Sequence, residues 1–267
     1  MDAYCSRCGE KRRDHADWKL SSIVSEAFAE ITNLEHSKLW QTFWLLVFKP
    51  GQLTRNYWSG RRKSFVGPVK LYLVLFALTL VLYSIHRPTA VYDVRSLAGA
   101  DPRGNAARVF ERLASKRSVP LEQIVQELNS RWQSYISLSQ PAYPLFVALA
   151  LMLLLRRRKL YFAEHLIFAL HTLAFMLFSF AVTWPLFPLL GIQPSHEPFS
   201  AVYLLISGAG LIWMSAYLVL ALRRAYGEGW LAALGKGTLV LLTYFVTTFL
   251  FMFITLALAI AVTKRGG

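Results

Sequence analysis

Long apolar blocks separated by short polar segments dominate the chain from residue 68 onward. Five of these blocks approach the roughly 20 residues that an α-helix needs to cross the hydrocarbon core of a membrane. The pattern therefore predicts an all-α fold, a polytopic membrane bundle of about five transmembrane helices. We place these spans at about residues 68–85, 138–155, 160–183, 199–222 and 238–262.

A different pattern precedes residue 68. In residues 20–35 the apolar residues recur at three- and four-residue spacing, which is typical of an amphipathic helix. The following segment, SKLWQTFWLLVFKP, is rich in tryptophan and phenylalanine but too short to cross a membrane. Because tryptophan favours the headgroup region, we predict an interfacial helix here. The Pro50-Gly51 pair is expected to end it.

These patterns divide the chain into three parts. Residues 1–19 form a cysteine-containing segment, residues 20–66 carry the amphipathic helices and a basic cluster, and residues 67–267 form the transmembrane domain. The longest segment between two spans covers residues 87–137, and its second half repeats apolar residues at helical spacing. We predict that this segment is external and forms a small helical cap against the membrane.

The number and the positions of the charged residues are typical of a membrane protein whose apolar blocks are flanked by basic residues. Only 16% of the residues are charged, against about one quarter in average soluble proteins, yet the net charge is +14. The basic residues flank apolar blocks instead of forming one continuous patch. In a membrane protein this distribution indicates orientation and attraction to anionic lipid. We therefore expect anionic membrane lipid as a partner, expect no nucleic acid, and leave self-association into a homo-oligomer open.

The short loops predict the orientation. Residues 156–159 hold four lysines and arginines and residues 223–236 hold three, whereas residues 184–198 hold none. The positive-inside rule therefore places the N-terminus in the cytoplasm and the C-terminus outside, although Lys264 and Arg265 count against this. The N-terminus has no apolar signal-peptide region, so we expect the first span to direct insertion.

Two cysteines, Cys5 and Cys8, form a CxxC pair followed by Gly9. Such a turn supplies two thiolates to a zinc ribbon, and a structural zinc site needs four ligands. His15 and His36 are candidates for a further ligand, and a second chain is another. Zinc is the one cofactor that the pattern suggests. The alternative is a degenerate knuckle with inert thiols, which we expect to stay reduced in the cytoplasm.

A basic cluster stands directly before the first predicted span. Its members are Arg55, Tyr57, Arg61, Arg62 and Lys63. One interpretation is a positive-inside anchor for that span. The other is a binding site for a lipid headgroup or another anion, because arginine offers paired donors to phosphate and aromatic side chains favour headgroup depth.

The third predicted span contains three ionisable residues, Glu164, His165 and His171. Glu164 and His171 are two helical turns apart and share a face, about 10 Å apart along the axis. Ionisable groups within a span are costly and mark functional sites by default. The alternative is that Glu164 and His165 lie at the membrane boundary, where Glu164 pairs with Arg157.

Taken in order, these motifs resemble an uncharacterised bacterial membrane family, a domain of unknown function. The motifs are the CxxCG turn at Cys5, Thr42, Pro50-Gly51, Tyr57-x-x-Gly60-Arg61-Arg62, Pro68, Glu164-His165 and His171. The chain departs from that family at Glu10, Arg61 and Phe65, where glutamine, lysine and tyrosine are usual. The resemblance implies a bacterial inner-membrane protein with an N-terminal knuckle and no assigned activity.

Two functions compete at this point. The first is the transport or handling of an anionic lipid or small anion, with the basic cluster binding the anion and Glu164 and His171 lining a polar path. The second is a non-enzymatic scaffold or regulatory protein that recruits a partner through its cytoplasmic N-terminal part. We find no Ser-His-Asp set, phosphate-binding loop or zinc-protease motif, so the sequence does not predict an enzyme.

Overall fold

A computed structural model describes residues 36–86, 94–95, 104–191 and 201–265. All regular secondary structure in these ranges is helical, which confirms the all-α prediction. The predicted cysteine knuckle of residues 1–19 and the predicted amphipathic helix of residues 20–35 lie outside the described residues.

Four helical segments are long and apolar enough to cross a membrane, which supports a membrane protein. They are Leu121–Leu154, Phe162–Thr183 (α9), Ala201–Tyr226 (α11) and Trp230–Lys264, the last within α12, Trp230–Arg265. Helix α4, Pro68–His86, begins where the first span was predicted. Its apolar part, Pro68–Leu82, is shorter than the other four. A fifth crossing therefore stays a prediction.

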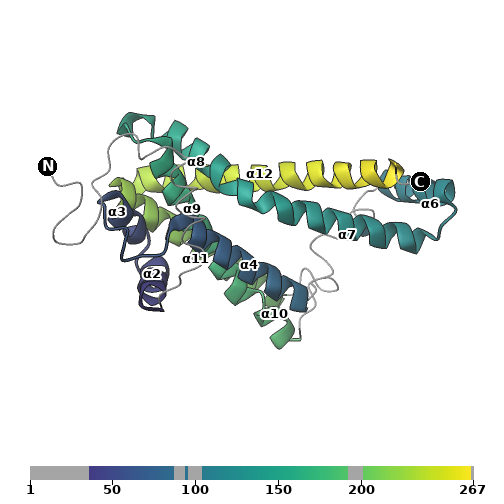
Figure 1. The fold of residues 1–267 in the computed structure, drawn as a ribbon, viewed down its shortest axis with the longest axis horizontal. Helices are drawn as coiled ribbons and strands as arrows, with labels where there is room; N and C mark the ends of the chain where they lie inside the picture. Colours follow the sequence, from purple (N-terminus) through teal and green to yellow (C-terminus); the bar gives the residue numbers. More distant parts are fainter. Residues whose placement is uncertain (1–35, 87–93, 96–103, 192–200, 266–267) are drawn as a thin grey trace.

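The path of the chain through the bundle alternates in direction (Figure 1). Helix α4 starts beside α3 (Gln52–Trp58) and leads away from it, and the chain then reaches α6, Asn105–Arg117, at the far end of the molecule. The teal helix formed by α7 and α8 returns toward α3. Helices α9 and α11 make the next pair of passes, and the yellow α12 runs back to α6, where the C-terminus lies.

The segment of residues 87–137, predicted to be a separate cap, ends in a helix that runs almost directly into the bundle. Helix α7, Leu121–Ser139, joins α8, Tyr143–Leu154, through one short 3-10 turn, η2 (Gln140–Ala142). Helix α12 contains 36 residues and is therefore about 54 Å long, well beyond a hydrocarbon thickness of about 30 Å. Helices α7 and α12 lie side by side over much of this length (Figure 1).

We call the assembly of α6, α7 and the C-terminal part of α12 the arm. Its core contains Phe110 of α6, Ile124 and Trp132 of α7, and Ala259 of α12, all of them buried. The indole N–H of Trp132 also donates to the carbonyl oxygen of Met252 at 3.2 Å. The predicted cap is thus a helical arm built on α12, and the run predicted as the last span contributes to its core.

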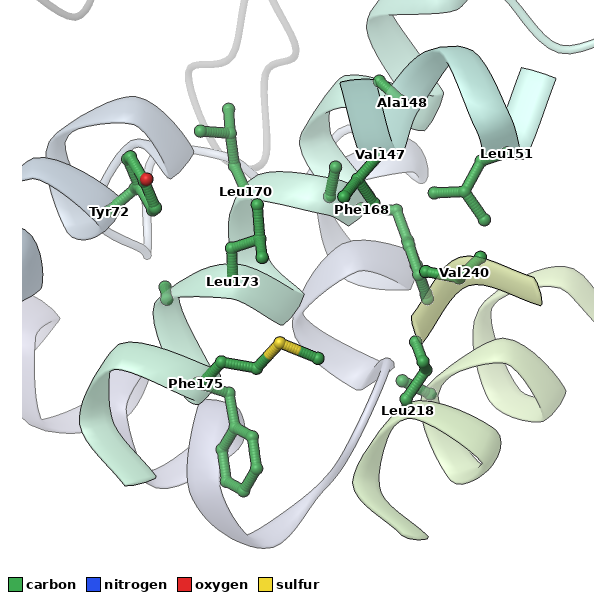
Figure 2. Close-up of a cluster of buried hydrophobic side chains, with 14 of the residues drawn as sticks. Tyr72, Val147, Ala148, Leu151, Phe168, Leu170, Leu173, Phe175, Leu218 and Val240 are labelled. Carbon is green, nitrogen blue, oxygen red and sulfur yellow. The ribbon is translucent and has the colours of Figure 1, made fainter. Parts of the chain in front are cut away.

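Helix α9 is the central helix of the bundle. Two thirds of its apolar window is buried (67%), against 17% for α11 and α12, so α9 is surrounded by its neighbours while the other two lie at the periphery. A helix that is apolar on all sides is expected in such a position. Figure 2 shows Phe168 of α9 among side chains from neighbouring helices, including Val147 of α8, Leu218 of α11 and Val240 of α12.

Helix α2, His36–Phe48, carries two contrasting faces. Trp40, Trp44 and Phe48 recur every four residues and are exposed, whereas Thr42 and Leu46 are buried. An exposed aromatic stripe of this kind fits the predicted interfacial helix. Gly51 follows in a left-handed conformation (φ 76°), so the predicted Pro50-Gly51 break does end the helix.

Glu228 joins two turns at the α3 end of the bundle. One carboxylate oxygen accepts hydrogen bonds from Arg158, in the turn between α8 and α9, and the other accepts from Lys236 of α12 at 2.7 Å. Burial opposes ionisation, but the hydrogen bonds from Lys236 and Arg158 outweigh it and lower the pKa of the Glu228 carboxyl below its ordinary value.

A lowered pKa in the folded state means that Glu228 contributes stability above its unfolded pKa and loses it as the pH falls through the folded value. We therefore expect Glu228→Gln to destabilise the protein by about 1–2 kcal/mol at neutral pH, because Arg158 and Lys236 lose a charged acceptor. The difference should shrink below about pH 4. Thermal unfolding of the detergent-purified chain at several pH values measures this. Glu111→Gln, at an exposed position of α6, is the control.

A Glu228→Gln deficit that is equally large at neutral and at acidic pH would contradict this account. It would mean that the amide disturbs packing and that the charge of Glu228 does not matter.

Candidate functional site

Helix α3 is the element that assembles the site. It contacts α2, α9 and α11. A Cβ atom added at Gly51 would lie 2.5 Å from the carbonyl oxygen of Ala221 in α11, so the turn before α3 touches α11 directly. The guanidinium of Arg224 donates to the carbonyl oxygen of Pro50 at 2.9 Å. The Pro50-Gly51 turn is therefore a docking point as well as a helix end.

Thr42 fastens the loop that follows α3. Its hydroxyl is completely buried, donates to the carbonyl oxygen of Lys38 at 2.6 Å and accepts the backbone N–H of Val66 at 2.9 Å. The loop between α3 and α4, which carries the basic residues, is thus attached to α2 at its far end. This explains the presence of a threonine in an otherwise apolar face of α2.

His171 of α9 lies against α3. Its Nδ1 atom shares a hydrogen bond of 2.9 Å with the hydroxyl of Thr54, and both side chains are buried. The Tyr57 ring packs edge-on against the imidazole, with ring centroids 5.8 Å apart. The Nε2 atom of His171 is buried and has no hydrogen-bond partner within the described part of the chain. A buried polar atom in this state is costly, which favours a functional over a packing role.

His165 belongs to a second cluster. Its Nδ1 atom shares a hydrogen bond of 2.9 Å with the Tyr226 hydroxyl, and the two rings are stacked at 5.7 Å. Tyr226 also contacts the rings of Trp58 and Phe168 at centroid distances of 5.0 Å. Tyr226, at the end of α11, therefore contacts α3 through Trp58 and α9 through His165 and Phe168.

Glu164 has a local role at the start of α9. Its carboxylate accepts the backbone N–H of Tyr161 at 2.8 Å and so caps the first turn of α9. The residue is half-buried, and Arg62 lies close enough to act on it electrostatically. Glu164 is therefore connected to the basic loop, whereas His171 is connected to α3.

The basic cluster divides into one oriented cation and three exposed ones. Arg62 is half-buried, its Nε atom donates to the carbonyl oxygen of Tyr57 at 3.2 Å, and its guanidinium lies 5.8 Å from the centre of the Tyr57 ring. Arg55, Arg61 and Lys63 are exposed. Tyr57 contacts both Arg62 and His171, so the predicted basic cluster and part of the predicted intramembrane polar group form one connected site.

Further cations gather at the same end of the molecule. The turn η3, Arg156–Arg158, and the junction of α11 with α12 both lie near α3 (Figure 1). Arg224 reaches Pro50 and Arg158 reaches Glu228, while the Arg223 guanidinium lies 3.6 Å from the centre of the Trp230 ring. From the sequence alone these residues indicate orientation only, and Thr54 and Tyr226 belong to no pattern that marks them as site residues.

Residues 36–80 match the model of a family described as "Protein of unknown function (DUF3667)". The matched segment contains α2, α3 and most of α4, and therefore Thr42, Gly51, Thr54, Tyr57 and Arg62. This fits the expected resemblance to an uncharacterised domain. The cysteine pair and the Glu164–His171 segment lie outside the match. No curated protein and no solved structure matches the chain.

The predicted zinc ligands Cys5, Cys8 and His15 lie outside the described residues, so the zinc-binding knuckle stays a prediction.

The close contact at Gly51 yields a test of how α3 is seated. We expect Gly51→Ala to destabilise the protein by more than the roughly 1–2 kcal/mol that a left-handed conformation costs an L-residue, because the new methyl group also meets the backbone of α11. Gly60→Ala is the matched control, since Gly60 also has a positive φ but a methyl group added there would meet nothing within 4 Å. Thermal unfolding in detergent compares the two variants; equal losses would show that the contact is unimportant.

Proposed function

We propose that the chain is an integral protein of the bacterial inner membrane that binds an anionic lipid, through its phosphate group, or a small anion of similar chemistry at the end formed by α3 and the loop before α4. The contact of Tyr57 with both Arg62 and His171 is the observation that carries this proposal. It makes an oriented cation and a buried, incompletely bonded imidazole part of one arrangement.

The chemistry of this end suits a phosphate. Arginine presents a planar fork of donors that matches phosphate oxygens, and Arg62 is held by the Tyr57 carbonyl while Arg61 stands exposed beside it. Several other cations lie on neighbouring turns, which strengthens attraction to anionic lipid. A cation whose orientation is already set loses less entropy on binding than a free side chain.

The aromatic surroundings suit the headgroup region of a membrane. A shallow groove is lined by Trp40, Trp44 and Leu45 of α2 together with Phe65 of the basic loop. Tryptophan and tyrosine concentrate at membrane interfaces, where phosphate groups also lie. The proposed anion site is therefore at a depth that a lipid headgroup reaches without leaving the bilayer.

His171 is proposed to act as a positioning residue for Tyr57. It is buried between α9 and α3, so it contacts the site from the inside and not from the surface. This supports binding and handling of a ligand at the basic end more directly than passage of a ligand along α9. Glu164 caps α9 at the same end of the bundle, close to Arg62.

Replacing arginine by lysine tests the anion site while conserving charge. We expect Arg61→Lys/Arg62→Lys to insert normally but to bind phosphatidylglycerol roughly tenfold or more weakly, because paired charge-assisted hydrogen bonds worth about 1.5–3 kcal/mol are lost. Most of the loss should come from Arg62→Lys, since Arg62 is the oriented residue. Native mass spectrometry of the purified chain, with phosphatidylcholine as the comparison lipid, measures the binding.

Arg112→Lys on α6 is the matched control, because Arg112 is an exposed arginine far from α3. If the double variant keeps its preference for phosphatidylglycerol, the anion site is rejected and the basic cluster is only a positive-inside anchor.

The proposed orientation places the α3 end in the cytoplasm, supported by the gathering of Arg156–Arg158, Arg224 and the basic loop at that end. Reporter fusions after residues 60 and 230 should then be active in the cytoplasm, and fusions after residues 110 and 190 should be active outside. A fusion after residue 190 that is active only in the cytoplasm would reject this topology.

A further inference from the structure

A second feature of the bundle lies apart from the α3 site. A cavity of about 200 Å³ opens between α4, α7, α8, α9, α11 and α12. Most of its wall is apolar or aromatic, including Phe76 of α4, Leu173 and Met176 of α9, and Tyr244 of α12. An enclosed apolar cavity of about 150 Å³ in another protein stays dry and accepts benzene. The mostly apolar wall makes this larger cavity suited to an apolar ligand.

The cavity reaches the outer surface of the bundle between helices. Leu80 of α4 and Phe180 of α9 line it and are also exposed, by 38% and 37%. Both belong to apolar helices, so this opening faces the region where lipid chains would lie. A ligand can thus enter from the side, out of the bilayer, without crossing the polar ends of the protein.

Polar side chains form a minor part of the cavity wall. Gln133 and Ser137 of α7 belong to it, as do Gln140 of η2 and Thr79 of α4, whose hydroxyl donates to the carbonyl oxygen of Leu75. The Tyr72 hydroxyl is already occupied, since it donates to the carbonyl oxygen of Gln140 at 2.8 Å.

The Tyr143 hydroxyl is buried and lies close to the hydroxyls of Ser139 and Thr248. The neighbouring hydroxyls of Ser139 and Thr248 donate to backbone carbonyls. Tyr143 also lines the cavity. A mostly apolar wall with a few polar groups is the arrangement that binding pockets for amphiphiles use to orient a ligand.

We propose that this cavity binds a single hydrocarbon chain of a membrane amphiphile, with the chain among Phe76, Leu173 and Met176 and the polar group of the amphiphile toward Gln133 and Ser137. The site takes the chain and needs no phosphate. It is therefore distinct from the anion site at α3, and neither site depends on the other.

A neutral probe tests this inference. The full chain in lipid nanodiscs is irradiated with a long-chain alcohol that carries a photoactivatable diazirine in the middle of its chain, and the labelled peptides are identified by mass spectrometry. We expect saturable labelling of the α4, α7 and α9 peptides that line the cavity. An excess of the unlabelled alcohol should compete with it.

Two substitutions fill the cavity from opposite sides, and each has a matched control. Thr79→Phe and Ser137→Leu enlarge lining residues of α4 and α7 and should each reduce labelling several-fold. Ala77→Phe and Ser134→Leu add at least comparable bulk at exposed positions nearby that do not line the cavity, and they should leave labelling unchanged. The unfolding temperature of each variant shows whether it folds. If one filling variant does not fold, labelling of the other filling variant tests the proposal.

Labelling that does not saturate, or that persists unchanged in the filling variants, would overturn the proposal. Arg62→Ala separates the two sites: the hydrocarbon site predicts unchanged labelling with the neutral alcohol, and a several-fold loss would show that the chain is bound only as part of a headgroup complex. Weakened phosphatidylglycerol binding with unchanged alcohol labelling would leave both proposals standing separately.

Discussion

The contact of the Pro50-Gly51 turn with α11 is the constraint on which the candidate site depends. Only a residue without a side chain allows the backbone to approach Ala221 this closely, and the left-handed conformation of Gly51 directs α3 back toward α9. Helix α3 has only seven residues, too few to be stable alone, so its position comes from this contact and from packing. Thr54, Tyr57 and Trp58 reach α9 and α11 as a consequence.

The polar groups of α9 show why such a short helix is needed. His165 and His171 are buried in the central helix, where a polar group without a partner is expensive. Tyr226 of α11 supplies the partner for His165, and Thr54 of α3 supplies one partner for His171. Packing of α3 therefore satisfies one ring nitrogen of His171, and the other has no partner among the described residues.

Hydropathy and spacing predicted the helical class and the starts of several helices, and they identified Arg62, Tyr57 and His171 as candidates. They could not predict that these residues meet, because Thr54 and His171 are 117 positions apart and only tertiary packing joins them. Spacing also placed Glu164 and His171 on one face, but it could not show that the Glu164 carboxylate turns back to cap its own helix. Tyr226 could not be predicted as a site residue, because a tyrosine at the end of an apolar helix is common at a membrane boundary.

Helix α12 illustrates a further limit of hydropathy. Its apolar run is continuous, yet its two sides differ in residue size: Thr255, Ala259 and Thr263 are buried, while Phe249, Phe253 and Leu258 are exposed. Small residues allow close approach of helices in an apolar surrounding, where the hydrophobic effect does not drive association. Large exposed side chains remain suited to contact with lipid. Average hydropathy is high on both sides of α12. It therefore predicts a span but does not distinguish the face of α12 that packs within the arm.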